Sequence, residues 1–219
     1  MINLDFWVVL GQWPMLLRGL MLTCLLTLVA APAGTCVGIA CAWSRVHGPA
    51  WLRGAVGSYV ELIRNTPFII QLFFVFFGLP AAGIRLSPET ASIVGMLLNL
   101  GAYACEIIRA GIEATPRGQI EAAQSLALNP WQIFTRVVLP PSLARVWPAL
   151  VSQIIIVMLG SAVCGQISTE EISYAANLIS SRTFRNIESY IIVTLVYLGL
   201  AVALRQLLNW IGPRFIFGR

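Results

Sequence analysis

The stretch that decides the fold is GLMLTCLLTLVAAPAGTCVGIACAWS, residues 19–44, in which none of the 26 side chains is charged. Roughly 20 helical residues cross the hydrocarbon core of a bilayer, so this run is long enough to span a membrane. It is also longer than the apolar core of a cleaved signal peptide, roughly 7–15 residues, and no positive charge precedes Arg18. We therefore interpret it as a retained transmembrane helix.

The composition of the whole chain agrees with a membrane location. Of the 219 residues, 58% are hydrophobic and only 11% are charged, with a mean hydropathy of +0.82. Soluble domains carry about 25% charged residues, so a water-soluble enzyme is excluded as the default. All 14 basic residues are arginines. The absence of lysine excludes a lysine-containing phosphate loop and a Schiff-base mechanism in this chain.

Four further apolar runs complete the expected fold. Residues 65–84 and 146–169 are uncharged over 20 and 24 residues, and two shorter neutral runs, 90–105 and 189–204, are extended by apolar neighbours and end beside arginines that can snorkel. We predict an all-α membrane protein with a single domain over residues 1–219. Its five transmembrane helices are expected at about residues 16–43, 60–80, 88–109, 146–166 and 188–209.

The distribution of arginines predicts the orientation of these helices. With the N-terminus outside, ten of the fourteen arginines face the cytoplasm, and only Arg18, Arg85, Arg182 and Arg185 lie outside. The positive-inside rule therefore predicts an outside N-terminus and a cytoplasmic C-terminus. The net charge of +5 is then explained by topology and by contact with anionic lipid, and not by nucleic-acid binding.

The longest segment on the predicted inner side, about residues 113–141, has its own helical signals. Residues 119–126 are good helix formers, Asn129 can cap a second helix with Pro130 at its first position, and Pro140-Pro141 is expected to end that helix. The sequence thus predicts a helix-turn-helix on the inner face. Its composition suits docking of another protein or an amphipathic helix resting on lipid, and leaves both open.

Residues 121–140, EAAQSLALNPWQIFTRVVLP, resemble the EAA loop of permease subunits of type I ABC importers. This chain has Ala127 at the glycine of the family pattern and Val137 at its isoleucine. The stretches RNTPFIIQLFFVFFGLP (64–80), GAYACEIIRAGI (101–112) and SSRTFRNIESY (180–190) resemble the permeases of polar amino acid uptake systems of the histidine, glutamine and arginine type.

The resemblance implies a multi-pass subunit in a bacterial inner membrane that is not itself an enzyme. It implies a second permease, identical or paralogous, a cytoplasmic ABC ATPase dimer that uses ATP and Mg, an extracytoplasmic solute-binding receptor, and no cofactor or metal on this chain. The loop would act as a coupling helix docked on the ATPase. The residues that this assigns to the coupling loop are Glu121, Ala122, Ala123, Ala127, Trp131, Leu139 and Pro140.

Polar residues within the spans are candidates for the substrate path, because burying them unpaired costs free energy. Glu106, Arg109 and Glu113 are spaced so that one arginine can meet both carboxylates on one helix face. Such a stripe either holds the coupling loop in place or presents Glu106 to a passing amino group. A Thr66 cap on the helix after Pro67 is the expected role of that hydroxyl. The candidate path residues are Glu61, Arg64, Gln71, Glu106, Gln153 and Ser161.

Two weaker signals complete the prediction. Gly34 and Gly38 form a GxxxG pair that suits close helix packing, within the chain or in a dimer. The five cysteines form no CxxC pair and His47 is the single histidine, so no metal site is expected. The leading function is a permease of an ATP-driven amino acid importer. The alternatives are an ATP-independent channel or ion-coupled carrier that uses Glu106, and a scaffold that only recruits a partner.

Overall fold

The computed structural model describes residues 4–216, and every regular element in that range is helical. The α-helices are α1 (Phe6–Leu10), α2 (Trp13–His47), α3 (Ala50–Arg64), α4 (Phe68–Phe73), α5 (Pro88–Glu113), α6 (Arg117–Ser125), α7 (Pro130–Gln132), α8 (Leu139–Gly160), α9 (Ile172–Thr183) and α10 (Asn186–Ile211). Short π-helical turns form η1 (Phe74–Gly78), η3 (Ile133–Val138) and η5 (Gly212–Ile216), and 3₁₀ turns form η2 (Leu79–Ala82) and η4 (Ser161–Ile167).

Within residues 4–216, four helical stretches are long and apolar enough to cross a membrane: Trp13–His47, Pro88–Glu113, Pro130–Ile167 and Asn186–Arg214. The predicted spans 16–43, 88–109, 146–166 and 188–209 fall within them. The predicted span 60–80 does not fall in one helix, because α3 and the helical turns from Phe68 to Ala82 are bent by 113° relative to each other. The number of spans is five if that bent pair counts as one.

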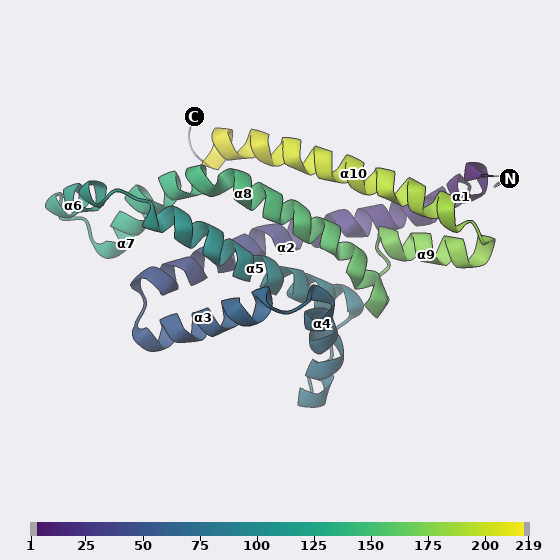
Figure 1. The fold of residues 1–219 in the computed structure, drawn as a ribbon, viewed down its shortest axis with the longest axis horizontal. Coiled ribbons are helices and arrows are strands. Elements are labelled where there is room, and N and C mark those ends of the chain that lie inside the picture. The colour runs from purple at the N-terminus through teal and green to yellow at the C-terminus, as the bar shows by residue number, and fades with distance from the viewer. Residues whose placement is uncertain (1–3, 217–219) are drawn as a thin grey trace.

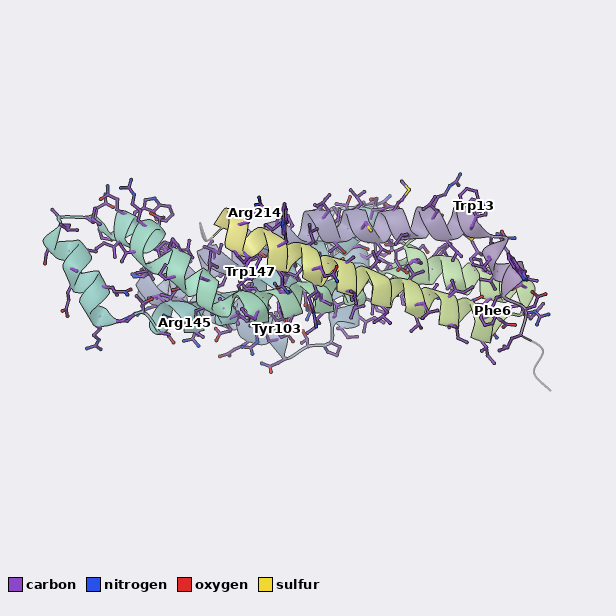
Figure 2. The ribbon with its side chains drawn as sticks, turned by 90° about the horizontal axis from the view of Figure 1, so that it is seen from above. Phe6, Trp13, Tyr103, Arg145, Trp147 and Arg214 are labelled. Carbon is purple, nitrogen blue, oxygen red and sulfur yellow. The ribbon has the colours of Figure 1, made fainter. Side chains whose placement is uncertain are left out.

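The long helices run side by side along the long axis of an elongated molecule (Figure 1). α6 and α7 lie at one end of this axis, called here the α6 end, and α1 and α9 lie at the other, the α9 end (Figure 1). Figure 2 shows Phe6 and Trp13 at the α9 end and Arg145 toward the α6 end. The helical part of the chain therefore begins at the α9 end, and α10 returns from there toward the opposite end.

The closest helix pair is α2 with α5, and two glycines on α2 make the approach possible. A Cβ added to Gly34 would lie 2.8 Å from the Cβ of Leu100, and one added to Gly38 would lie 2.5 Å from the Cβ of Ala104. Carbon atoms in contact are about 3.5–4.0 Å apart, so neither position has room for a side chain. The GxxxG pair thus serves packing within this chain.

The break between α3 and α4 lies at Asn65-Thr66-Pro67, because a proline disfavours helical backbone in the residue before it. The expected Thr66 cap on the following helix is wrong. Its hydroxyl donates to the carbonyl of Leu62 at 2.8 Å, and the Asn65 side-chain amide donates to the carbonyl of Glu61 at 2.8 Å. Both side chains complete the C-terminal end of α3, which leaves carbonyl groups with no following helical turn.

The expectation that Pro140-Pro141 ends a helix is also wrong. The chain stays helical from Pro130 to Ile167, and the two prolines lie in the first turn of α8 directly after the π-helical turn η3. Proline is tolerated in a first helical turn, where an amide hydrogen has no regular partner, and a π-turn resets the hydrogen-bond pattern just before it. The loop segment is therefore continuous with the fourth span.

Candidate functional site

The segment 113–141 forms the α6 end of the molecule, and its fold follows from local sequence. Asn129 caps α7 as predicted: its side chain accepts from the backbone N–H of Gln132, and the Gln132 side chain accepts from the backbone N–H of Asn129. Pro130 occupies the first turn of that helix. Between α6 and α7, Ala127 has a left-handed backbone with φ of 54°. This is the conformation that glycine adopts most easily after a helix C-terminus, which gives a physical reason for glycine in the family pattern.

The predicted coupling residues divide into an exposed set and a buried set. Glu121, Ala122, Ala127 and Trp131 are exposed, and the indole of Trp131 is 62% accessible. By contrast, Ala123 is only 4% exposed and Leu139 and Pro140 are half-buried. The exposed set provides the surface that another protein can reach, whereas Ala123 faces the core of its own chain.

The buried side of the segment belongs to a core that also includes the ends of the long helices. Ala123, Ile133, Phe134 and Val138 from the segment are all buried, with at most 7% of each residue exposed. They join the core residues Ala42, Val60, Ala102, Ala104, Cys105, Ile108, Ile112 and Leu150. The segment therefore packs on α2, α3, α5 and α8. This side-chain packing fixes its position in addition to the covalent connections to α5 and α8.

A charged cavity of about 300 Å³ opens between α2, α3 and α5. Its lining consists of Arg45, Val60, Glu61, Arg64, Asn65, Tyr103 and Glu106. Figure 2 shows Tyr103 toward the middle of the long axis, and the Arg64 guanidinium lies over its ring at 5.5 Å from the centroid. Three of the six predicted path residues, Glu61, Arg64 and Glu106, are therefore brought together. Two arginines and two glutamates give this cavity both signs of charge.

Glu106 is the carboxylate on which the arginines converge. Arg109 donates to it at 2.8 Å and to Glu113 at 2.6 Å, so the predicted bridge between two carboxylates is confirmed. Arg45 and Arg64 approach the same carboxylate more loosely, at 3.8 and 3.9 Å. Both guanidinium groups line the cavity, and their salt bridges to Glu106 are longer than a hydrogen bond, so each can also approach an anionic group in the cavity.

The other three candidate path residues lie elsewhere. The Gln71 side-chain amide donates to the carbonyls of Ile63 and Thr66, at 2.7 and 2.9 Å, and its oxygen accepts from Asn99 at 3.0 Å. Gln71 thus satisfies the backbone that the break exposes, as unpaired groups at membrane depth require. Gln153 is half-buried in α8 and Ser161 is fully buried in η4.

Sequence reasoning missed a buried polar site at the α9 end. The predicted topology places the connection between the last two spans outside the membrane, yet within it Glu171 is fully buried and nearby Glu188 is 3% exposed. The Glu171 carboxylate accepts from the backbone N–H groups of Ser173 and Tyr174, at 2.9 and 2.7 Å, and from the Tyr197 hydroxyl at 2.6 Å. Burial raises the pKa of Glu171 despite these hydrogen bonds. The N-cap role was readable from an acid before an apolar run, whereas the burial comes from the packing of α9 against α2.

No cluster of three or more metal-ligating side chains occurs within residues 4–216. His47, the single histidine, is the last residue of α2 and its ring stacks on Trp43. The charged cavity and the exposed part of the segment 113–141 are the two candidate functional sites considered below.

Comparison with known proteins finds a family and relatives that cover most of the chain. The chain matches the family described as binding-protein-dependent transport system inner membrane component over residues 34–217. It is 32% identical to the probable glutamine ABC transporter permease protein GlnM of Bacillus subtilis (strain 168), over 94% of this chain and 96% of that protein. It is 33% identical to the arginine transport system permease protein ArtQ of the same organism, over 92% and 93%.

A solved structure gives the same answer for the fold. The crystal structure of an amino acid ABC transporter with histidines superposes with a TM-score of 0.86 at 31% identity, covering 98% of this chain and all of that one. The chain belongs to the binding-protein-dependent transport system inner membrane component family, the permease subunits of ABC transporters.

Proposed function

We propose that this chain is the permease subunit of an ATP-driven importer of polar amino acids or close derivatives, forming the translocation path and receiving work from a cytoplasmic ATPase. The observation that carries the proposal is the segment 113–141, which is anchored in the core of the chain and exposes Glu121, Ala122 and Trp131 at one end of the bundle. A channel needs no such structured docking surface. ATP and Mg would be bound by the ATPase dimer, because this chain has no lysine for a phosphate loop.

The proposed orientation places the α6 end in the cytoplasm of a bacterial cell and the α9 end outside its inner membrane, where a solute-binding receptor would dock. The arginine distribution supports it, since Arg109, Arg117, Arg136 and Arg145 flank or lie within the segment. Apolar side chains such as Met21, Leu28, Leu195 and Leu198 are 59–72% exposed on α2 and α10. Lipid and a second permease, identical or paralogous, would cover these faces, and nucleic acid has no part in the function.

The charged cavity supports a zwitterionic substrate. A free amino acid carries one carboxylate and one ammonium group, and the lining offers Arg45 and Arg64 for the first and Glu61 for the second. The relatives carry different amino acids by name at nearly the same identity, glutamine for GlnM and arginine for ArtQ. Sequence identity to these relatives therefore does not distinguish one polar amino acid from another as the substrate. The proposed substrate class rests on the charges that line the cavity.

The alternative of an ion-coupled carrier with Glu106 as its titrating group has less support. Such a mechanism needs a carboxylate whose charge is poorly compensated in at least one state. Glu106 has one guanidinium in hydrogen-bond contact and two more within 4 Å. The geometry therefore favours Glu106 as the acidic centre of a charged cavity over Glu106 as a proton carrier.

The first experiment tests coupling. The chain is co-expressed with its second permease and ATPase, purified, and reconstituted in vesicles with the receptor, ATP and Mg, and uptake of radiolabelled glutamine, arginine, histidine and cystine is measured. We expect ATP-dependent uptake of at least one of them, and a loss of uptake in Glu121→Lys with ATP hydrolysis retained. Glu170→Lys, an equal charge reversal on an exposed residue at the opposite end of the molecule, is the control for membrane insertion and ATPase binding, both of which it should leave unchanged. Absence of any associated ATPase and of ATP-dependent uptake would refute the proposal.

The second experiment tests the cavity. Glu106→Gln should lower uptake while the ATPase stays bound, because the charge balance of the cavity changes. Glu113→Gln is the matched control, since Glu113 binds the same Arg109 but does not line the cavity. Equal effects of the two substitutions, or loss of Glu106→Gln from the membrane, would assign Glu106 to structure alone.

A further inference from the structure

Four aromatic rings connect the end of α2 with the segment 113–141. The Trp43 ring stacks on the His47 ring with centroids 5.9 Å apart, and it meets the rings of Trp131 and Phe134 edge-on at 6.1 and 6.2 Å. His47 also meets Phe134 at 6.1 Å, and Trp131 meets Phe134 at 6.0 Å. These four residues are called the aromatic cluster below. All the separations lie within the range in which aromatic rings attract each other.

The cluster joins two segments that are far apart in the sequence. Trp131 and Phe134 belong to α7 and η3, which continue directly into α8, whereas Trp43 and His47 belong to the last turns of α2, almost 90 positions earlier. Trp131 is 62% exposed although it touches Trp43. One part of its ring is therefore available to a docked protein while another part contacts α2.

The end of α2 that carries Trp43 is packed tightly on α5. α2 has 35 residues with one internal proline, Pro32, and on the Trp43 side of this proline Gly34 and Gly38 hold the helix against α5 with no space for a side chain between them. A displacement applied at Trp43 therefore reaches the contact with α5 before it reaches the proline, and it is passed to α5. Beyond the proline, at the α9 end, a backbone N–H of α9 donates to Thr23 of α2.

We propose that Trp43 and His47 are positioning residues that pass the displacement of Trp131, pressed by a docked ATPase, into α2. The first span is then driven by the ATPase through ring contacts, in addition to α5 and α8, which are driven through the chain itself. This inference rests on the proposed function, because it requires an ATPase at Trp131. It assigns a mechanical role to a helix outside the coupling loop.

The experiment compares uptake per ATP hydrolysed in the reconstituted complex. Trp43→Ala removes three ring contacts, and Trp43→Phe keeps an aromatic ring at the same place. Trp51→Ala is the control, since Trp51 is 73% exposed on α3 and is not a member of the cluster. We expect uptake per ATP to fall about fivefold or more in Trp43→Ala, to recover to within about twofold of wild type in Trp43→Phe, and to stay unchanged in Trp51→Ala. ATPase binding and basal ATP hydrolysis should be retained in all three.

A second variant covers the case in which Trp43→Ala does not fold. His47 is exposed, so His47→Ala should leave the fold intact and lower uptake per ATP about twofold. The inference is overturned if His47→Ala and Trp43→Ala both show the same uptake per ATP as Trp51→Ala. It is also overturned if these variants lose the ATPase from the complex, because the cluster would then support docking and not transmission. If the wild-type complex binds no ATPase, the proposed function fails instead, so the two failures are distinguishable.

Discussion

Gly38 is a position at which the packing of two long helices leaves no room for a side chain. We predict that Gly38→Ala destabilises the chain, because the new Cβ would lie 2.5 Å from the Cβ of Ala104 and 3.1 Å from the backbone of Ala104 and Cys105. These neighbours are a short side chain and helical backbone, which have no free rotamer with which to withdraw. The helices α2 and α5 would have to move apart.

The size of the effect follows from the required movement. Contacting carbon atoms need about 3.5 Å, so the two helices must separate by roughly 1 Å at this point, and a gap of 0.5–1 Å removes about a quarter to a half of each van der Waals contact around it. Overpacking of this kind costs about 1–3 kcal/mol. Replacing a helical glycine by alanine returns about 0.5–1 kcal/mol through helix propensity. The net loss is therefore at most about 2.5 kcal/mol, and the middle of both ranges gives about 1 kcal/mol.

The assay is thermal unfolding of the purified protein in detergent, followed by the loss of monodisperse protein after heating. Gly54→Ala and Gly199→Ala are matched controls, because a Cβ at either position meets no atom within 4 Å and each glycine lies within a helix. Both should keep or raise the unfolding temperature. The double variant Gly38→Ala with Ala104→Gly, which removes the nearest clashing atom, should recover part of the loss.

The result that would refute this reasoning is a Gly38→Ala protein as stable as the two controls. That outcome would mean that α2 and α5 are not in van der Waals contact at Gly38, and that the GxxxG pair serves contact with another chain. Failure of the double variant to recover any stability would locate the strain away from Ala104.

Three further predictions concern backbone strain and a buried carboxylate. Ala127→Gly should raise the free energy of unfolding by about 0.5–1 kcal/mol, since a left-handed alanine costs about 1–2 kcal/mol and glycine loses part of that to unfolded-state entropy; an unchanged melting temperature would contradict it. Phe184 has a φ of 57° and is 86% exposed, so Phe184→Gly should also raise the melting temperature of the chain in the same assay. For Glu171, the pKa is raised in the folded chain, so the folded state keeps its proton where the unfolded state has lost it. Wild type should therefore lose stability relative to Glu171→Gln as the pH rises above the unfolded-state pKa of about 4.3. A constant difference between the melting temperatures of the two proteins from pH 4 to 7 would exclude this.

The parts of the fold that follow from local chemistry were predictable. Uncharged runs of sufficient length located the long helices, Asn129 followed by Pro130 located the start of α7, and the three- and four-residue spacings located the bridge from Arg109 to two carboxylates. Each of these signals acts within one helical turn or along one helix. The sequence therefore contains them without reference to any other element.

The parts that depend on distant elements were not predictable. Glu171 is buried because α9 packs on α2, the aromatic cluster forms because η3 folds back on the end of α2, and Ala123 faces the core of its own chain. The prolines at 140 and 141 were misjudged because a π-turn before them changes the hydrogen-bond pattern that a proline would otherwise break. Hydrophobic periodicity contains none of this information.

The break between α3 and α4 has a consequence for the order in which the chain enters the membrane. During synthesis, Gln71 leaves the ribosome before Asn99, at roughly 5–20 residues per second, so the bond between their side chains cannot yet exist when α4 first meets lipid. α3 carries Arg53, Glu61 and Arg64 and is a poor candidate to insert alone. The second span is therefore expected to remain at the protein-conducting channel until α5 has emerged, and Asn99→Leu should delay its insertion without shortening any helix.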